Sequence, residues 1–479
     1  MSNASLTKNT TYYTIALTIQ KILAFVYFWL ISNALFAEQL GQYVFALSFT
    51  TLFSIFIDLG LSPILTREAS KDKQSANQYL QNVLGIKLPL TIITLAAAWL
   101  VINISNKPDD VRLLVYLASF IMTLDSFSLS FWVIFRARQV LKYESLTTVA
   151  VQIIIFTLGV IALKTSGQVK DLIIALLVAS IFNFLVSLAL LKFKLKFSIR
   201  PRFDKTIAIH FLKIVPAFAI AGIFVKIYNT SDSVLLSYLD SDEAVGFFAV
   251  PAKVVYALQQ IIPAAFAAVI FPAFSYYHKN SKPLLEKTFT KAFNYLTIIS
   301  LPLTAGLMAT IPEVTQTVWP EYTAVVPTFY VMTLAIPFIF LAFPTGYLLN
   351  ACDRQKNTTI NRGIITFLAV TLNLILIPKL SYFGAGVTFL ITNFILLFLD
   401  LIWVKQTIVL ETKKLLKTIF KSSLAAALMI ILVIAIKSYF NLLVIIPLGA
   451  LTYFGVLLML RGIQIKELNE IFNKGFRNG

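Results

Sequence analysis

Long apolar runs recur from one end of this sequence to the other, and they constrain its fold more than any other feature. Each run ends at charged residues, prolines or glycines. An α-helix needs about 20 apolar residues to cross the ~30 Å hydrocarbon core of a bilayer. The sequence therefore predicts an all-α polytopic membrane protein with fourteen transmembrane helices. The predicted spans lie near residues 8–34, 41–61, 79–102, 112–135, 146–164, 171–191, 210–238, 245–271, 289–311, 325–349, 359–378, 383–404, 417–437 and 440–460.

Composition excludes several other classes of protein. Hydrophobic residues make up 58% of the chain and charged residues 13%, whereas a soluble domain is about a quarter charged. The net charge of +18 would suit a nucleic-acid ligand, but the basic residues lie between the apolar runs, where their role is topological. Cys352 is the single cysteine, and His210 and His278 are the two histidines. We therefore predict no nucleic-acid partner, no disulfide, no metal site and no bound cofactor.

Basic residues are unevenly shared between the two sides of the predicted helix array. Connections on the side of the N-terminus carry 29 lysines and arginines, and those on the opposite side carry 6. The positive-inside rule then predicts a multi-pass protein of the plasma (inner) membrane with both termini cytoplasmic. A cleaved signal peptide is the alternative interpretation of the first run. It is disfavoured because the run is long, contains Lys21 and belongs to an internal repeat.

A weak internal repeat organises the chain. The segment Glu38–Ala46 recurs as Glu243–Pro251, an offset of 205 residues, and shorter matches follow in chain order at offsets of 214 and 210. Each copy holds six predicted spans, and an even number preserves orientation, so the copies form a parallel repeat. We predict two six-helix lobes, over residues 1–205 and 206–410, and two additional C-terminal helices with a cytoplasmic tail over 411–479.

Lysines inside the predicted spans are candidate site residues, because a charge at mid-bilayer costs about 2.5–3.5 kcal/mol on insertion scales. Lys21 and Lys226 lie near mid-span at the repeat offset of 205, which makes them pseudo-symmetric partners facing one cleft. They either bind substrate or form structural ion pairs. Lys87 and Lys253 lie about 12 Å from a helix end at 1.5 Å per residue, a depth that snorkelling also explains. Lysine presents a compact charge with three donors, which suits a diphosphate.

Acidic and polar residues complete the set of candidates. Asp125 is mid-helix among hydroxyl residues, as expected beside a hydrated cavity. Asp232 could bind a coupling cation, H⁺ or Na⁺, or pair with a lysine. Tyr228 and Asn229 could contact sugars, although tyrosine is also a common anchor at the membrane interface. Asp58 lies within about one turn of a predicted helix end, and we interpret it mainly as an interfacial residue.

Several short motifs, spread over almost the whole chain, have the pattern of a known family. They are Leu35-Phe-Ala-Glu38-Gln-Leu-Gly41-Gln-Tyr43, Asp58-Leu-Gly60-Leu61, Arg67-Glu68, Asp232 with Glu243-Ala-Val-Gly246-Phe-Phe248, and Tyr382-Phe-Gly384-Ala-Gly386. These motifs resemble the polysaccharide-transporter flippases of the multidrug/oligosaccharidyl-lipid/polysaccharide exporter superfamily, although Phe248 replaces the family's usual tyrosine. The resemblance implies two six-helix lobes in a V, two additional helices and alternating access. It also implies an undecaprenyl-diphosphate-linked oligosaccharide as substrate, moved from the cytoplasmic to the periplasmic leaflet, with an ion gradient acting through Asp125 or Asp232.

We therefore predict a flippase, and not an enzyme, that serves the synthesis of O-antigen, capsule or exopolysaccharide. Its predicted partners are the lipid-linked oligosaccharide, membrane lipid, a polysaccharide polymerase and glycosyltransferases. Within the same fold, the alternatives are a lipid II flippase and a cation-coupled exporter of small molecules or drugs. A membrane polysaccharide polymerase is the alternative from another class. It is disfavoured because the predicted external loops are short.

Overall fold

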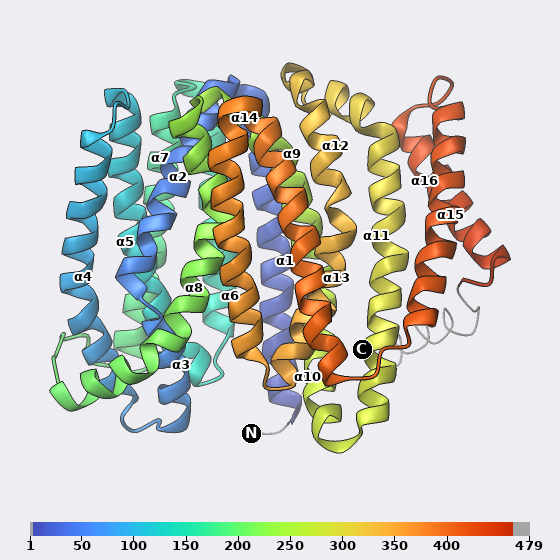
Figure 1. Ribbon diagram of the computed structural model, residues 1–479. Helices are drawn as coiled ribbons and strands as arrows, with labels where there is room; N and C mark the ends of the chain where they lie inside the picture. Colours follow the sequence, from blue (N-terminus) through green and yellow to red (C-terminus); the bar gives the residue numbers. More distant parts are fainter. Residues whose placement is uncertain (1–2, 463–479) are drawn as a thin grey trace. The chain divides into compact units, whose positions relative to one another are not determined.

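The structure is a computed structural model that describes the backbone of residues 3–462, and it describes side chains from residue 12 onward except at 212, 217, 218 and 268. All regular elements within residues 3–462 are helices (Figure 1). In chain order they are α1 (Asn3–Ala34), α2 (Ala37–Asp58), α3 (Leu61–Lys71), α4 (Ala76–Ile104), α5 (Asp109–Ala137), α6 (Lys142–Thr165), α7 (Val169–Ala189), the π-helix η1 (Leu190–Lys194), α8 (Lys205–Leu239), α9 (Asp242–Ile261), α10 (Pro263–Asn280), α11 (Lys282–Val318), the 3₁₀-helix η2 (Pro320–Val325), α12 (Val326–Leu334), α13 (Ile336–Ala351), α14 (Gln355–Thr407), α15 (Thr412–Ile436) and α16 (Leu442–Met459).

Most of these helices are long and apolar enough to cross a membrane. Twelve segments of the described chain meet that condition, or thirteen if the bent α8 counts as one span. A bend of 52° separates Lys205–Pro216 from Ala219–Leu239, and it follows Pro216, a residue type that interrupts the helical hydrogen-bond ladder. α14 joins the predicted spans 359–378 and 383–404 across Ser381, whose φ of 54° and ψ of −142° are not helical. The protein is a multi-pass membrane protein, and the count of fourteen crossings stays a prediction.

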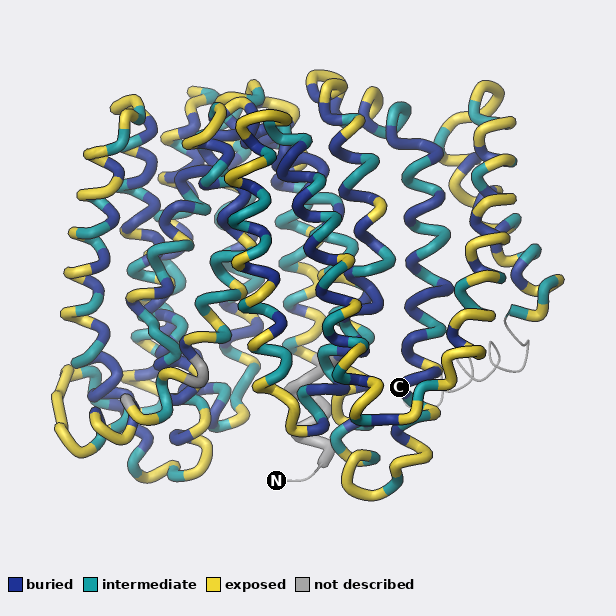
Figure 2. Tube along the Cα trace, viewed as in Figure 1, coloured by how far each residue is buried: buried dark blue, intermediate teal, exposed yellow. Residues whose placement is uncertain are grey.

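Apolar side chains cover outward faces of the helices. On α4, Ile92, Ile93, Leu100 and Ile104 are between 63% and 73% exposed. Figure 2 shows exposed positions recurring along α4, and also along α15 and α16. Extended apolar surfaces of this kind mark contact with lipid or with another protein. They are expected where helices face the hydrocarbon core of a bilayer.

Contacts divide the chain into two compact units. Unit 1 comprises Met1–Val250 with Thr366–Ala385, and unit 2 comprises Pro251–Ile365 with Gly386–Gly479. In unit 1, α1 packs on α6, α2 packs on α5 and α8, and α7 packs on α5 and α6. In unit 2, α11 packs on α13 and α15, and α15 packs on α16. The lobe boundaries predicted from the repeat stay a prediction, and the predicted cytoplasmic tail falls on residues 463–479, outside the described residues.

The connection after α2 contains the short helix α3. Leu59 and Gly60, with φ of 42° and 76°, end α2 in the left-handed region, and α3 begins at the next residue. Glycine adopts this conformation without a steric cost. The Asp58 carboxylate accepts hydrogen bonds from the Ser62 hydroxyl, at 2.5 Å, and from the Ser62 backbone N–H, at 3.4 Å. These bonds tie the end of α2 to the start of α3 and orient the carboxylate of Asp58.

Two glycines of the internal repeat pack against each other inside unit 1. A Cβ atom on Gly41 would lie 1.6 Å from the backbone oxygen of Asp242, and one on Gly246 would lie 1.9 Å from that of Ala37. Asp242 and Ala37 each precede the repeat glycine of their own helix by four residues, so the contact is reciprocal. Beside it, the Lys107 ammonium lies 2.7 Å from a carboxylate oxygen of Asp242. The repeat motif therefore marks a close helix crossing that requires a residue without a side chain.

Candidate functional site

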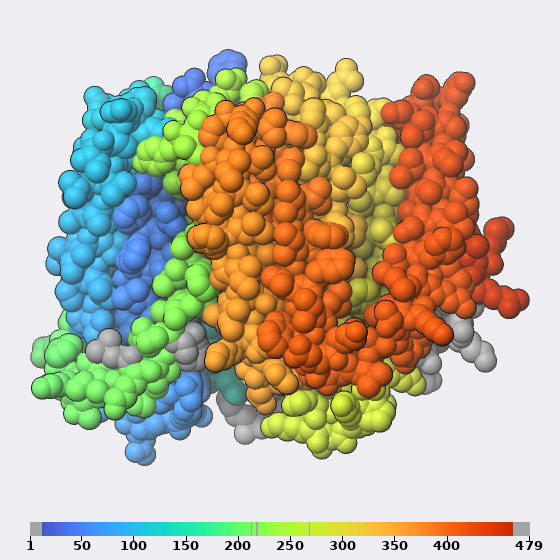
Figure 3. Space-filling model, viewed as in Figure 1, coloured from blue at the N-terminus to red at the C-terminus, as the bar shows by residue number. Residues whose placement is uncertain are grey.

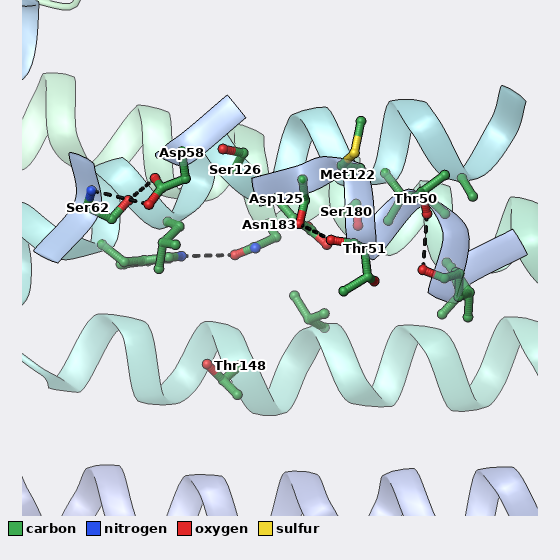
Figure 4. A pocket seen from close by; sticks show the side chains of 18 of the residues that line it. Thr50, Thr51, Asp58, Ser62, Met122, Asp125, Ser126, Thr148, Ser180 and Asn183 are labelled. Carbon is green, nitrogen blue, oxygen red and sulfur yellow. Dashed lines mark hydrogen bonds between the residues drawn. The ribbon is translucent and has the colours of Figure 1, made fainter. Parts of the chain in front are cut away.

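Unit 1 surrounds a cavity of about 770 Å³ between α1, α2, α3, α5, α6, α7 and α8. This volume lies within the ~300–1,000 Å³ typical of ligand pockets. Hydroxyl, amide and charged side chains line much of it, interleaved with apolar ones. The polar lining residues are Gln20, Thr50, Thr51, Ser54, Asp58, Ser62, Asp125, Ser126, Glu144, Thr148, Ser180, Asn183 and Lys226. In Figure 4, Asp58 and Ser62 lie toward one end of the view, Asp125 and Ser180 lie near its middle, and Thr148 faces them from across the space.

One wall of the cavity is a polar stripe along α2 and α3. Thr50, Ser54, Asp58 and Ser62 recur at intervals of four residues, which places them on one face of a helix. The stripe continues onto α3 because the turn at residues 59 and 60 is short. This four-residue spacing is visible in the sequence, and it would have identified Asp58 as a wall residue of a cavity. The depth of Asp58 along its helix, which alone suggested an interfacial residue, does not reveal that position.

Lys87 lies behind this wall and forms a buried ion pair. Its side chain is 0% exposed, and its Nζ is 2.6 Å from an Asp58 carboxylate oxygen. The same ammonium group donates to the Ser130 hydroxyl at 2.8 Å and to the Ser126 carbonyl and hydroxyl at 3.0 and 3.2 Å. Lys87, a predicted substrate-binding residue, is therefore not among the residues that line the cavity. Its contacts give it the role of holding α2 and α5 together through α4.

Lys226 lines the cavity directly. Its Nζ donates a hydrogen bond of 2.6 Å to the Ser54 hydroxyl, so α8 contributes the charge and α2 positions it. A lysine ammonium has three donors, and this bond uses one of them. The Asp58 carboxylate also attracts the Lys226 ammonium electrostatically. Among the predicted lysines of unit 1, Lys226 is the one that lines this cavity.

The acidic residues of the cavity differ in their partners. Glu144 is bound by the Arg136 guanidinium through two nitrogens, at 2.5 to 3.1 Å, and Asp58 is paired with Lys87. The carboxylate of Asp125 accepts a hydrogen bond from the neutral hydroxyl of Ser180, and no ion pair joins it to a described residue. Two of the three lining carboxylates are therefore neutralised by their own basic partners. Asp125 and Lys226 carry the remaining charges of the cavity wall.

Asp232 lies in a separate buried contact of unit 1, between α8 and α14. It is 6% exposed, and the side-chain amide of Asn373 donates to its carboxylate at 2.5 Å. No ion pair with a lysine is formed by Asp232 within the described residues, so one of the two predicted alternatives is not realised there. The side-chain oxygens of Asn373 and Ser231 are buried without a hydrogen-bond partner in the described part of the chain. The contact therefore presents oxygen ligands, and no lysine or arginine of the described part of the chain forms an ion pair with Asp232.

The other predicted site residues do not line this cavity. In unit 1, Lys21 on α1 and Tyr228 on α8 are half-buried, and Asn229 on α8 is exposed. None of the three is among the lining residues. Lys253, on α9, is half-buried in unit 2. The pairing of Lys21 with Lys226 across one cleft stays a prediction.

Glu68 lies on α3, which is not among the candidate spans, and belongs to a charged cluster. Burial raises the pKa of its carboxyl, but hydrogen bonds and charge from Lys71 and His210 outweigh burial and lower that pKa below its usual value of 4.5. The Lys71 ammonium is 3.2 Å from Glu68, and the His210 ring nitrogen is 3.5 Å away. This cluster links α3 to the first turns of α8.

Sequence comparison identifies the family of the chain. Residues 6–278 match the family model described as polysaccharide biosynthesis protein, which is more than half of the 479 residues. The chain belongs to the polysaccharide biosynthesis protein family. It is also 24% identical over 485 aligned positions to an uncharacterized membrane protein of Methanocaldococcus jannaschii, with 93% of each chain covered.

Solved structures share the fold of this family member. The lipid II flippase MurJ, in an inward closed conformation, matches with a TM-score of 0.78 at 16% identity, over 95% of this chain and 99% of that one. An inward-facing multidrug resistance MATE family transporter of the MOP superfamily matches with a TM-score of 0.66 at 14% identity, over 82% and 97%. A MOP superfamily transporter from Pyrococcus furiosus matches with a TM-score of 0.58 at 14% identity, over 84% and 95%. The chain therefore has the all-helical fold of these transporters.

Proposed function

We propose that this protein is a flippase that moves an undecaprenyl-diphosphate-linked oligosaccharide from the cytoplasmic to the outer leaflet of the plasma membrane by alternating access. The observation that carries the proposal is the cavity of about 770 Å³, whose wall is rich in hydroxyl and amide groups and holds the ammonium of Lys226. Membership of the polysaccharide biosynthesis protein family supports this class of substrate. The protein then acts as a transporter and not as an enzyme.

The chemistry of the wall suits the polar part of such a substrate. Hydroxyl and amide side chains donate and accept hydrogen bonds, as the hydroxyl groups of a sugar also do. Lys226 supplies a compact positive charge, which suits the diphosphate. A cation-coupled drug exporter would bind a cationic ligand through free carboxylates. Here two of the three lining carboxylates, Asp58 and Glu144, are already paired with Lys87 and Arg136, and the third, Asp125, shares the cavity wall with the ammonium of Lys226.

A lipid II flippase is the second candidate, because a structure with that described function shares this fold at a TM-score of 0.78. Lipid II is also a diphosphate-linked saccharide, so the same wall would serve it. The glycan itself distinguishes the two candidates, and transport of both lipids must therefore be measured. We also propose that both termini lie in the cytoplasm, as the positive-inside rule predicts. A polysaccharide polymerase and glycosyltransferases are the proposed partners of the first function.

We propose ion coupling through Asp125 and Asp232. Asp125 faces the cavity with a neutral hydroxyl partner, so it can take up H⁺ or Na⁺ beside the substrate. Asp232 is buried beside a partnerless amide oxygen of Asn373, and a carboxylate and an amide oxygen are ligands that suit Na⁺. An inward gradient of one of these ions would then drive the return of the empty transporter.

Translocation of a fluorescent undecaprenyl-diphosphate oligosaccharide in proteoliposomes tests the proposal. The variants are Lys226→Ala, Lys21→Ala with Lys226→Ala, and the matched control Lys170→Ala, which removes an exposed lysine at the start of α7. We expect transport by the wild type and the control, and a loss of at least about tenfold in Lys226→Ala, because a hydrogen bond to a charged group is worth roughly 1.5–3 kcal/mol.

Each other outcome revises a defined part of the proposal. Transport that survives Lys226→Ala would keep the flippase and reject the cavity as its diphosphate site. A further loss in the double variant would give Lys21 the paired role that the repeat predicts. If lipid II is moved and the oligosaccharide is not, under either a proton or a sodium gradient, the second candidate replaces the first.

A further inference from the structure

The segment between α7 and α8 is a basic strap, residues 192–205, that runs along the surface of unit 1. It begins in η1, continues without helical structure, and ends at the first residue of α8. Because it connects the end of the candidate span Val169–Lys194 to the start of α8, it lies at the level where the helices leave the membrane. In Figure 3 the green atoms of this region lie on the surface at the lower left.

Hydrogen bonds fix the backbone of the basic strap on α4. The backbone N–H of Ser198 donates to the Asn77 side chain at 3.0 Å, and that of Arg202 donates to the Gln81 carbonyl at 3.0 Å. The N–H of Asp204 donates to the side chain of Asn82 at 2.6 Å. The strap is therefore held at three points along two turns of one helix.

Close packing adds to this attachment. A Cβ atom on Gly85 would lie 2.2 Å from the backbone oxygen of Arg202, so the strap lies directly on the α4 backbone at that point. Phe197 is buried in the core formed by α3, α4 and α5, and the Arg138 guanidinium lies 4.7 Å from the centre of its ring. The backbone is thus preorganised, and little conformational entropy remains to be lost when a ligand binds.

The outward side of the basic strap combines positive charge with apolar anchors. Six basic side chains in fourteen residues are exposed, namely Lys192, Lys194, Lys196, Arg200, Arg202 and Lys205. The acidic residue of the segment, Asp204, accepts hydrogen bonds from the N–H groups of Thr206 and Ile207 at the start of α8. Phe193 and Phe203 are 75% and 71% exposed. Large aromatic side chains in water-exposed positions are costly unless they enter an apolar phase.

We propose that the basic strap binds the headgroups of anionic phospholipids, with Phe193 and Phe203 inserted among the acyl chains beneath them. Juxtamembrane basic residues gain about 1 kcal/mol each from an anionic bilayer surface, and aromatic residues prefer the membrane interface. A soluble acidic protein would be attracted by the same charges, but it would not account for two exposed phenylalanines at the level of the bilayer surface. The anionic lipid surface is therefore the partner that both features fit.

Lipid binding by the purified full-length protein tests this proposal without any transport measurement, so its outcome is independent of the proposed substrate. The probe is phosphatidylglycerol titrated into protein held in phosphatidylcholine nanodiscs or in a neutral detergent. Bound lipid is counted by native mass spectrometry, and thermal stabilisation is followed in parallel.

Two variants that each lose four positive charges distinguish the effect of the basic strap from the effect of net charge. The strap variant carries Lys192→Gln, Lys194→Gln, Lys196→Gln and Arg200→Gln. The control carries Lys279→Gln, Lys282→Gln, Lys287→Gln and Lys291→Gln, which are exposed lysines at the connection between α10 and α11 and on α11. We expect apparent affinity for phosphatidylglycerol to fall by about tenfold or more in the strap variant, and by less than about threefold in the control.

The remaining outcomes overturn the proposal. Equal losses in the two variants would mean non-specific attraction to basic surface, and wild-type binding without preference for phosphatidylglycerol over phosphatidylcholine would exclude a headgroup site. If inorganic phosphate raises the thermal stability as much as phosphatidylglycerol does, the strap is a phosphate site and does not bind a lipid surface. If the strap variant does not fold, the affinity of the wild type for phosphatidylglycerol is measured at 0.05 and 0.5 M KCl. Salt screens electrostatic binding, so an affinity that stays the same at both concentrations would contradict the proposal.

Discussion

Replacing Lys87 with methionine removes the ion-pair partner of the Asp58 carboxylate, which lies mostly buried at the wall of the cavity. The Lys87 side chain is 0% exposed and that of Asp58 is 18% exposed, with 2.6 Å between the charged atoms. Breaking a buried ion pair by removing one partner costs about 3–5 kcal/mol, because the other charge stays desolvated. Two serine hydroxyls and a carbonyl also lose their donor. We therefore expect Lys87→Met to lower the free energy of unfolding by about 3–5 kcal/mol.

The assay is an equilibrium unfolding titration with SDS in mixed micelles, followed by tryptophan fluorescence. The double variant Lys87→Met with Asp58→Asn removes both charges, and asparagine keeps an oxygen that can accept from Ser62. We expect it to recover most of the loss, with an interaction energy of at least about 2 kcal/mol in the double-mutant cycle. Lys164→Met, at an exposed position of α6, is the control, and it should change stability by less than about 0.5 kcal/mol.

Two results would refute this reasoning. A cost of less than about 1 kcal/mol for Lys87→Met would mean that water or another group replaces the lysine at no penalty. A double variant no more stable than Lys87→Met alone would mean that the loss comes from packing, and that the charge left on Asp58 contributes nothing.

Three further predictions rest on other contacts. Gly41→Ala should destabilise the protein by about 1–3 kcal/mol or more by overpacking, because the added Cβ would lie 1.6 Å from a backbone oxygen. Gly222→Ala is the control: no atom lies within 4 Å of its added Cβ, so it should be neutral or slightly stabilising in the same SDS titration. Asp125→Asn should abolish the response of lipid translocation to an imposed ion gradient and leave the thermal stability unchanged within a few degrees; an unaltered response would remove Asp125 from the coupling mechanism. The lowered pKa of Glu68 stabilises the fold above the unfolded value of about 4.5, and this stability is lost as pH falls through the folded pKa. Unfolding measured between pH 7 and 3 should therefore show a smaller acid loss in Glu68→Gln than in the wild type, and identical curves would contradict this.

Part of the site could be predicted from the sequence, because the depth of a residue in the membrane and the helix face it occupies depend on a single helix. A charge in an apolar run is costly wherever the run lies in the fold, and this led to Lys87, Asp125, Lys226 and Asp232. Hydroxyl residues at four-residue intervals likewise lie on one helix face whatever packs against it. What each charge does was not predictable, because its partner comes from another helix. Lys87 meets Asp58 from 29 residues away, and Asp232 meets Asn373 from 141 residues away.

The sequence by itself determined that this chain is an all-helical membrane protein, because the length and hydropathy of a run decide whether it can cross a bilayer. It also determined the family, through short motifs whose order is kept along the chain. Tertiary structure alone decided that Lys226 lines the cavity, whereas Lys87 lies behind its wall in an ion pair with Asp58. The physical reason is that depth in the membrane follows from position along one helix, whereas access to a cavity depends on which neighbouring side chains approach within hydrogen-bond distance.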